Sequence, residues 1–356
     1  MTQHLDEHLT HEASSPLEPT RVLRALVAAV VGMVMVASLS GCGATHALLG
    51  IHPAPKAKAT EVPLTVEQAK TIVTRSFTAA YLGETTAGAA SKAALRTAYT
   101  SEALRGVTGR IKLASVQPAV TPVSLQAQHP RLLAVSRGLT FPRFILAQTV
   151  AASGLPTLHL LVSPNAATPY RISNSVEMVP PATVKPFDPP SQGSPPVAEG
   201  GSKGTGLAVA PTTLLAQYAA QMRFPAKPIS NPPFAVDSFS GQLRAGAVGV
   251  AKAVSEQAAF AQEHQVLPGS VHAVRQAGGD ALVFGVIERK DYFGVKADQK
   301  VNTSGNKAFV LLTGKKEVTN GASITTLEFV VFAVPRSTGQ ATLVGAREQI
   351  VDGSGS

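Results

Sequence analysis

The sequence predicts an α+β protein in which helices precede antiparallel strands, and this order occurs twice. Apolar residues recur with helical spacing from 65 to 104 and then alternate with period two from 131 to 179. Residues 180–206 hold seven Pro and five Gly, and after them the helix-then-strand order repeats. Strands that follow one another without intervening helices favour antiparallel meanders over parallel βαβ units.

The first predicted domain spans residues 65–182 and opens with a helix over 65–82. Thr65 is its expected N-cap, and Gln68 three residues later completes a capping box. A second helical zone is predicted over 91–104. Four strands are expected after it, at 131–137, 144–150, 157–163 and 170–179.

A linker rich in Pro and Gly, residues 183–207, is predicted to join this domain to a second one at 208–352. The second domain should begin with a helix over 211–222 that has Pro211 in its first turn. A longer helix is predicted over 242–263. Five strands are expected after it, at 271–276, 280–289, 307–315, 324–334 and 341–351.

A curved antiparallel sheet wrapped round its N-terminal helices is the simplest way to bury the apolar faces of both kinds of element. This arrangement resembles the nuclear-transport-factor-2-like cone, here used twice. The same helix-then-sheet order also fits cystatin-like domains. The expected fold is therefore two small α+β domains of one of these kinds.

The composition limits the classes of function. A length of 356 residues suggests about two domains, and 44% apolar with 15% charged residues is typical of a chain that folds. The chain has no Trp and few aromatic residues, which argues against platforms for stacking nucleic-acid bases. A single Cys excludes an intramolecular disulfide framework and a cysteine-based zinc site.

The segment before the first domain has the pattern of a bacterial export signal. Arg21 and Arg24 precede an apolar run over residues 25–39. Leu39, Ser40, Gly41 and Cys42 then resemble the lipobox, in which small residues fit the signal peptidase and the thiol accepts diacylglycerol.

The lipobox resemblance implies a signal peptide at 1–41, a lipidated Cys42 and a tether at 42–64. Two or more acyl chains would hold the protein stably on the membrane. The alternative is an uncleaved transmembrane anchor, because no charged residue occurs from Ala25 to Ile51. Both place the remainder on the extracytoplasmic face of the cell membrane, because the preceding arginines hold the N-terminus inside.

The charge of the chain favours anionic partners. Residues 1–41 contain two basic and four acidic residues, so their removal raises the net charge from +9 to +11. A basic surface suits phospholipid headgroups or acidic wall polymers, and no motif points to nucleic acid. The acidic residues 1–20 are long for the start of a signal peptide, so they are either a cytoplasmic tail or the result of a start codon assigned too early.

Four stretches resemble a family of actinobacterial lipoproteins that carry a domain of unknown function (the DUF8094 type). They begin at Gly138, Ala167, Leu207 and Gly278, and the likeness covers most of residues 65–352. The most recognisable pieces are Phe141-Pro142-Arg143-Phe144 and Gly279-Asp280-Ala281-Leu282-Val283-Phe284. The family often has Trp where this chain has Phe144 and Tyr170. The resemblance implies a surface lipoprotein and assigns no catalytic or binding residue.

Motifs with catalytic chemistry are weak throughout the chain. Residues 200–204 match the G-x-S-x-G nucleophile pattern but lie in the predicted linker, without the strand and helix that the motif needs. His264 and His272 lack the spacing and the acidic partners of a metal site, so ordinary surface histidines are favoured. No metal or cofactor is therefore expected.

Three glutamates on candidate strands could form an acid–base pair in a cone cavity, namely Glu317, Glu328 and Glu348. Charges on the surface of the strands are the favoured interpretation of these residues. Because nothing stronger is present, we expect a protein that is not an enzyme.

The densest basic segment runs from 289 to 316. The favoured interpretation is a solvated hairpin with a long loop, and the sharper hypothesis is an electrostatic contact with lipid headgroups or acidic glycopolymer. Tyr292 and Phe293 would add an apolar contact at the tip. The basic residues are Arg289, Lys290, Lys296, Lys300, Lys307, Lys315 and Lys316.

The sequence therefore predicts a lipid-anchored, extracytoplasmic binding or scaffolding module of the cell envelope. Its expected partners are the membrane, through the anchor, and an envelope protein or acidic glycopolymer. The alternative is a carrier of a small molecule or lipid that uses an apolar cavity, and a hydrolase is a third, less favoured hypothesis.

Overall fold

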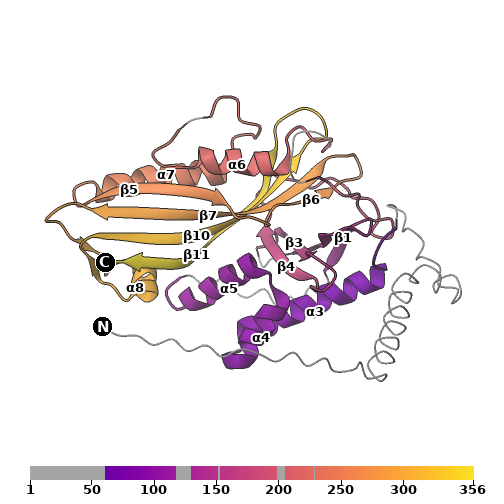
Figure 1. Cartoon of the computed structure of the whole chain (residues 1–356), viewed down its shortest axis with the longest axis horizontal. Coiled ribbons are helices and arrows are strands. Elements are labelled where there is room, and N and C mark those ends of the chain that lie inside the picture. The colour runs from indigo at the N-terminus through magenta and orange to yellow at the C-terminus, as the bar shows by residue number, and fades with distance from the viewer. Residues whose placement is uncertain (1–60, 118–129, 151–152, 199–204, 228) are drawn as a thin grey trace, which may run out of the picture. The chain divides into compact units, whose positions relative to one another are not determined.

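The computed structural model describes residues 61–117, 130–150, 153–198, 205–227 and 229–356 (Figure 1). These residues build helices and antiparallel sheets, which confirms the α+β class. The predicted signal peptide 1–41 and the predicted tether up to residue 60 lie outside the described residues. Within the described part of the chain, no helix has the length and apolar character needed to cross a membrane.

The first predicted helix is confirmed as α3 (Val66–Thr85). The Thr65 side chain accepts a hydrogen bond from the Gln68 backbone N–H, and the Gln68 side chain accepts one from the Thr65 N–H, which is the expected capping box. The second helical zone is two helices, α4 (Gly88–Ala98) and α5 (Ser101–Leu113). They separate because Tyr99 is extended and the next N–H donates to the backbone carbonyl of Ile172.

All four strands predicted in the first half are present and form one antiparallel sheet in sequence order. Opposite residues such as Leu146 and Leu160 are both fully buried, so the centre of this sheet is apolar. Phe77 of α3 packs edge-on against His159 of this sheet. The strands are β1 (Arg131–Val135), β2 (Arg143–Val150), β3 (Pro156–Ser163) and β4 (Arg171–Glu177).

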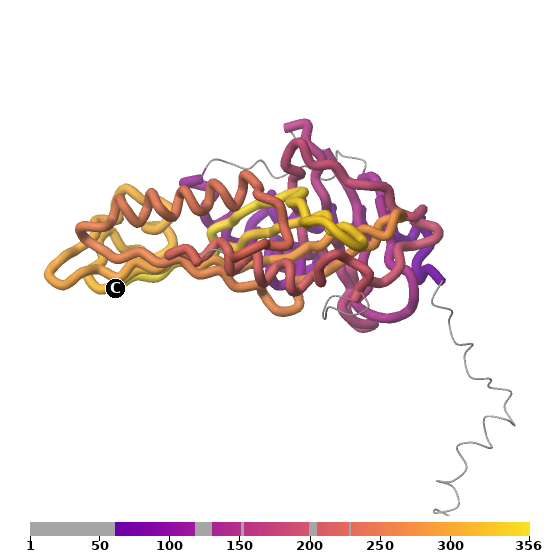
Figure 2. The backbone as a smooth tube through the Cα atoms, turned by 90° about the horizontal axis from the view of Figure 1, so that it is seen from above, coloured from indigo at the N-terminus to yellow at the C-terminus, as the bar shows by residue number. Residues whose placement is uncertain are grey.

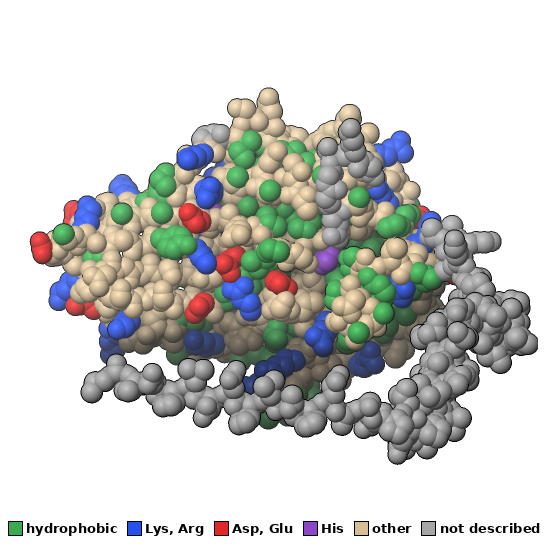
Figure 3. Space-filling view, in the orientation of Figure 1, with side chains coloured by type: hydrophobic (Ala, Val, Ile, Leu, Met, Phe, Trp, Pro, Cys, Tyr) green, Lys and Arg blue, Asp and Glu red, His purple; other side chains and the backbone are tan. Residues whose placement is uncertain are grey.

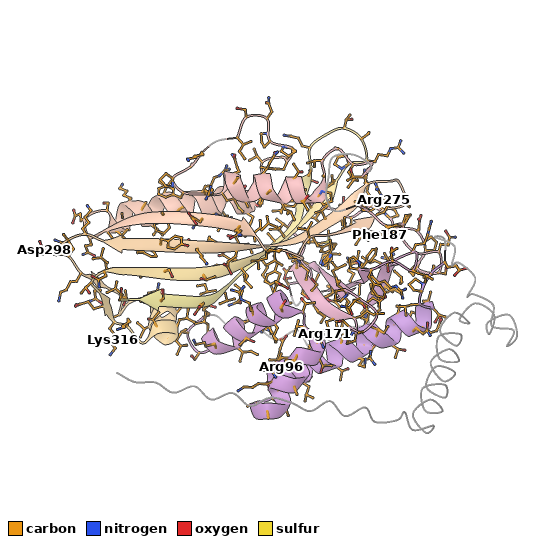
Figure 4. All side chains as sticks on the ribbon, in the orientation of Figure 1. Arg96, Arg171, Phe187, Arg275, Asp298 and Lys316 are labelled. Atoms are coloured by element: carbon orange, nitrogen blue, oxygen red, sulfur yellow. The ribbon has the colours of Figure 1, made fainter. Side chains whose placement is uncertain are left out.

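Residues 179–198, here called the proline-rich segment, are held to both halves of the chain by backbone hydrogen bonds. Ser194 N–H donates to the carbonyl of Val135 at 2.7 Å, next to the first sheet. Ala277 N–H donates to the carbonyl of Pro186 at 3.0 Å, in the second half. Figure 4 shows Phe187 close to Arg275, at the opposite end of the second sheet from Asp298 and Lys316. The described part of the predicted linker is therefore an ordered strap.

The helices of the second half are partly as predicted. Helix α6 (Pro211–Gln221) begins with Pro211, as expected. Helix α7 (Ser238–Val254) is capped by the Asp237 carboxylate, which accepts from Ser240 N–H at 2.7 Å. The prediction of helix up to residue 263 is wrong, because Ala258–Val266 is strand β5. There the alternate residues 258, 262 and 264 are buried while 259, 263 and 265 are exposed, which is the period of a strand.

A second prediction, the strand over 307–315, is also wrong, because Lys307–Thr313 is helix α8. The Asn306 side chain caps the helix by accepting from Phe309 N–H at 3.0 Å. Gly314 ends it in the left-handed conformation that favours glycine. These two end signals outweigh the apolar, strand-like composition between them. Short strands β8 (Val301–Asn302) and β9 (Glu317–Val318) pair beside it.

The second sheet has the order β11-β10-β7-β5, with β6 also paired to β7. Figure 1 shows α6 and α7 on one side of this sheet and the first half of the chain on the other. Figure 2 shows α7 running along the long strands. The remaining strands are β6 (His272–Arg275), β7 (Ala281–Val295), β10 (Gly321–Val334) and β11 (Thr342–Gly355).

The two faces of the second sheet belong to two apolar cores. Val283 and Val330 face α6 and pack with its Tyr218. Phe284 and Phe329 face the other way and join one cluster with side chains of the first half, including Phe77. The described residues, from 61 to 356, accordingly form one compact unit. The domain boundaries at 182 and 208 stay a prediction, but the two stretches that they separate share a core.

Candidate functional site

A pocket of about 680 Å³ lies at the end of the second sheet. Its size is within the range of small-molecule and cofactor sites, about 300–1,000 Å³. Four stretches of the chain meet in its walls: the start of the proline-rich segment, the residues before α7, the turn between β6 and β7, and the hairpin between β10 and β11. The site therefore depends on residues far apart in the sequence. We call it the strap pocket.

The walls of the strap pocket are mostly apolar. Pro180, Pro181 and Ala182 form one wall, and side chains of β10 and β11 such as Val334 and Leu343 form another. Val236 also lines the pocket and is 92% exposed, the highest exposure of any large apolar side chain in the described residues. A partner that covers Val236 would bind more tightly, because removal of this apolar side chain from water is favourable.

The polar groups of the strap pocket are held in place by internal bonds. The Lys185 ammonium pairs with the Asp280 carboxylate, which also accepts from the Arg336 backbone N–H at 2.9 Å. The hydrogen bond from Lys185 lowers the pKa of Asp280, so this carboxylate stays ionised.

Asp237 also lines the pocket, and its carboxylate accepts from Ser240 and from the Tyr218 hydroxyl at 3.2 Å. Burial, together with the charge of Asp237, raises the pKa of Tyr218, so its hydroxyl remains a donor. Because these carboxylates are bound by neighbours, the pocket offers an apolar surface with fixed polar edges. Such a surface suits the binding of an apolar segment.

The three candidate glutamates are only partly brought together. Glu328 of β10 lies directly opposite Glu348 of β11, and both accept from Arg289 Nη1, at 3.2 and 2.8 Å. Glu317 lies apart, on β9, where it pairs with Lys300 at 3.0 Å. The prediction that Glu317 and Glu328 lie on neighbouring strands is therefore wrong, and Glu348 is the residue that faces Glu328. The favoured interpretation as surface charges is wrong for Glu328, which is 0% exposed, and fits Glu317 and Glu348, which are each 48% exposed.

Around Arg289 the structure assembles an ionic group, here called the Arg289 cluster, that is buried at His264 and Glu328 and exposed at Glu348. Its members are His264, Arg289, Asp291, Glu328 and Glu348. His264 Nε2 lies 3.2 Å from Glu328 Oε1, and both side chains are 0% exposed. Arg289 Nε lies 3.4 Å from the carboxylate of Asp291. Burial acts to lower the pKa of Arg289, but the surrounding carboxylates outweigh burial and raise it. The guanidinium is therefore the permanent positive centre of the cluster.

The interpretation of His264 and His272 as surface histidines is wrong, because both are buried. His264 lies opposite Arg289 on β7, and His272 lies opposite Phe284 on the same strand. Directly opposite residues share a face and successive residues alternate, so the two imidazoles lie on opposite faces of the sheet. They cannot share a metal. Within the described residues, no group of three or more His, Cys, Asp or Glu could hold a metal ion.

The seven basic residues predicted to contact an anionic surface do not form one free surface. Arg289 points into its cluster, Lys290 pairs with Glu288 at 3.4 Å, and the Lys296 ammonium donates to the carbonyl of Ser255 at 2.6 Å. Lys307, Lys315 and Lys316 are exposed at the two ends of α8. On the face shown in Figure 3, basic and acidic side chains are interspersed at this end of the sheet.

Several predicted site residues lie outside the described residues. They are the lipobox residues Leu39, Ser40, Gly41 and Cys42, and the G-x-S-x-G stretch at 200–204. The strap pocket, in contrast, was not predicted. Its only local signals are the pair Pro180-Pro181 and the turn at Gly279-Asp280, where Gly279 has a φ of +88°.

Comparison of the chain with protein-family models, curated proteins and solved structures finds no match. The resemblance to actinobacterial lipoproteins therefore stays a prediction from the sequence.

Proposed function

We propose that the chain is a lipid-anchored protein on the extracytoplasmic face of the cell membrane that binds an envelope component in the strap pocket. The observation that carries the binding role is the pocket itself, about 680 Å³ with mostly apolar walls. The support for the anchor is the sequence that ends in Cys42.

The chemistry of the pocket favours an apolar segment of an envelope protein as the ligand. Lys185 and Asp280 satisfy each other, so the ligand need not supply a charge. The backbone of the proline-rich segment and the exposed Val236 offer contacts along one side. The alternative occupant is a small molecule or a lipid acyl chain, which would make the protein a carrier.

A second candidate function is contact with lipid headgroups or acidic glycopolymer. The observation that favours it is the exposure of Lys307, Lys315 and Lys316 around α8. The Arg289 cluster supports a structural role better than a hydrolase, because His264 and Glu328 are shielded from solvent.

For the finer fold, we propose that the two halves are variants of the nuclear-transport-factor-2-like cone or of the cystatin-like domain. The support is the order of elements. In the part of the chain that the structure describes, three helices precede a four-stranded antiparallel sheet in the first half, and two helices precede the larger sheet in the second.

The proposed binding role can be tested by purification of the full chain from its native envelope in mild detergent, with mass spectrometry of the proteins and lipids that accompany it. Val236→Glu places a charge at the pocket, and Val248→Glu on α7 is the matched control, since Val248 is 58% exposed and does not line the pocket. We expect one component to be lost from Val236→Glu and retained by Val248→Glu. The Cys42→Ala variant should no longer be found in the membrane fraction, because it lacks the residue that would carry the lipid.

The class of the lost component distinguishes the two kinds of ligand. A protein supports the binding module, and a lipid or small molecule supports the carrier. Identical components in the wild type and in both valine variants would contradict a role for the strap pocket.

A further inference from the structure

A second, much smaller cavity lies on the other face of the second sheet, where β11 meets the helices of the first half. Its volume is about 30 Å³, which is room for one or two water-sized particles. Charged and hydroxyl groups dominate its lining, which includes Glu84, Tyr99, Arg110, Ser175 and Arg347.

Among the described residues, the charges that line this cavity do not balance. The Glu84 carboxylate uses both oxygens internally, because Tyr99 donates to Oε1 and Arg110 donates to Oε2. Burial, with Glu84 beside it, raises the pKa of Tyr99 well above its usual value, so the phenol carries no charge. Glu84 therefore neutralises Arg110, and Arg347 remains as an excess positive charge.

Arg347 has no anionic partner in the described residues. Its buried Nε lacks a hydrogen-bond acceptor there, and its guanidinium carbon lies 4.9 Å from the centre of the Phe329 ring. Burial and the nearby charge of Arg110 lower the pKa of Arg347, and they outweigh the opposing effect of Glu84 and Tyr99 across the cavity. Arg347 is half-buried as a residue, and a guanidinium whose Nε is buried without an acceptor is unfavourable unless something neutralises it.

We propose that this cavity binds one small monovalent anion of halide size, with Arg347 as its main ligand. The guanidinium supplies the missing positive contact, and the anion cancels the excess charge. The volume excludes a phosphate or a carboxylate metabolite. His159 does not alter this balance. It shares a hydrogen bond with Ser175, and burial lowers the pKa of His159 to about 3, so it is neutral at ordinary pH.

The anion would join parts of the chain that are distant in sequence. Glu84 lies in α3, Arg110 in α5 and Ser175 in β4, whereas Arg347 lies in β11. An anion that binds the folded state and not the unfolded chain raises stability with its concentration. The stability of the protein should therefore depend on chloride itself, in addition to ionic strength.

The test uses the full chain in detergent and measures its Tm in sodium chloride and in sodium gluconate at equal ionic strength. We expect chloride, and bromide likewise, to raise the Tm by about 2 °C or more, with saturation. Arg347→Met should remove this difference. Arg105→Met is the control, because Arg105 is an exposed residue of α5 that pairs with Glu288 outside the cavity, and it should keep the difference.

An equal Tm of the wild type in chloride and gluconate at every concentration would show that the cavity holds water, and would overturn the proposal. If Arg347→Met does not fold, crystals of the wild type grown in bromide decide the question by anomalous diffraction. A bromide peak beside Arg347 supports the site, and a cavity without one overturns it.

Discussion

At the scale of single residues, the ion pair of Arg289 and Glu328 is the centre of the charged cluster on the second sheet. Arg289 takes one carboxylate from its own strand, Asp291, and two from strands on one side of β7, Glu328 of β10 and Glu348 of β11, so its charge is compensated within the sheet. Glu328 is fully shielded, and its Oε2 and the Nδ1 of His264 have no hydrogen-bond partner among the described residues. Removal of one charge from such a group leaves the others uncompensated.

Glu328→Gln keeps the size of the side chain and removes its charge. We expect the free energy of unfolding to fall by about 3 kcal/mol, because Arg289 and His264 lose a buried partner. Glu317→Gln is the matched control, since Glu317 and Lys300 are 48% and 68% exposed, and its effect should stay within about 0.5 kcal/mol. Urea unfolding of the wild type and of both variants measures these changes in the free energy of unfolding. Equal losses would contradict a structural role for the Arg289 cluster.

The sequence could not have revealed this cluster as a unit. It marked Arg289 as part of a basic surface and Glu328 and Glu348 as separate strand charges. The three residues lie on β7, β10 and β11, and only the register of these strands brings them together. A register between strands distant in the chain is set by the folded core, and no local pattern encodes it.

At the scale of elements, local signals predicted the structure where they were complete. Thr65 with Gln68, and Pro211 at a helix start, gave correct helices because capping acts within one turn. The wrong predictions came where the composition of a segment was given more weight than the residues that begin or end a helix. Asn306 and Gly314 enclose a helix of strand-like composition. The apolar pattern of α7 continues into residues 258–263, but these residues pair with β7 and therefore form a strand.

The contact between α6 and β7 depends on one glycine. A Cβ added at Gly285 would lie 2.3 Å from Cδ1 of Leu215, which is fully buried in α6. Gly285→Ala should therefore lower the free energy of unfolding by about 1–3 kcal/mol through overpacking.

Gly294→Ala, in the same strand, is the control for this prediction. A Cβ there would have no neighbour within 4 Å, so we expect almost no loss. Chemical denaturation compares the two variants. If Gly285→Ala were as stable as Gly294→Ala, the described packing of α6 on the sheet would be wrong.

At the scale of the whole molecule, the described residues of both halves form one body. Phe77 of the first half and Phe329 of the second belong to the same buried cluster. The strap pocket has walls from both sides of the predicted linker. The composition of that linker predicted a spacer, but its carbonyl and amide groups hydrogen-bond to both halves. Proline-rich sequence therefore did not reveal that this segment would be a structural strap.

A close approach of the chain between the halves offers a way to test this unity. Gly109 of α5 lies against β11, and a Cβ there would be 2.5 Å from the carbonyl oxygen of Ile350. The neighbouring backbone cannot move without disturbing the sheet. Gly109→Ala should therefore weaken the contact between the halves. If the halves fold as one unit, the stability of both should fall.

Scanning calorimetry of the full chain and of Gly109→Ala tests most directly whether the two halves are one folding unit that builds the strap pocket jointly. We predict one unfolding transition for residues 57–356, with equal calorimetric and van't Hoff enthalpies, that moves as a whole to lower temperature in the variant. Two separate transitions, of which only one moves or neither does, would contradict this account and support two independent domains.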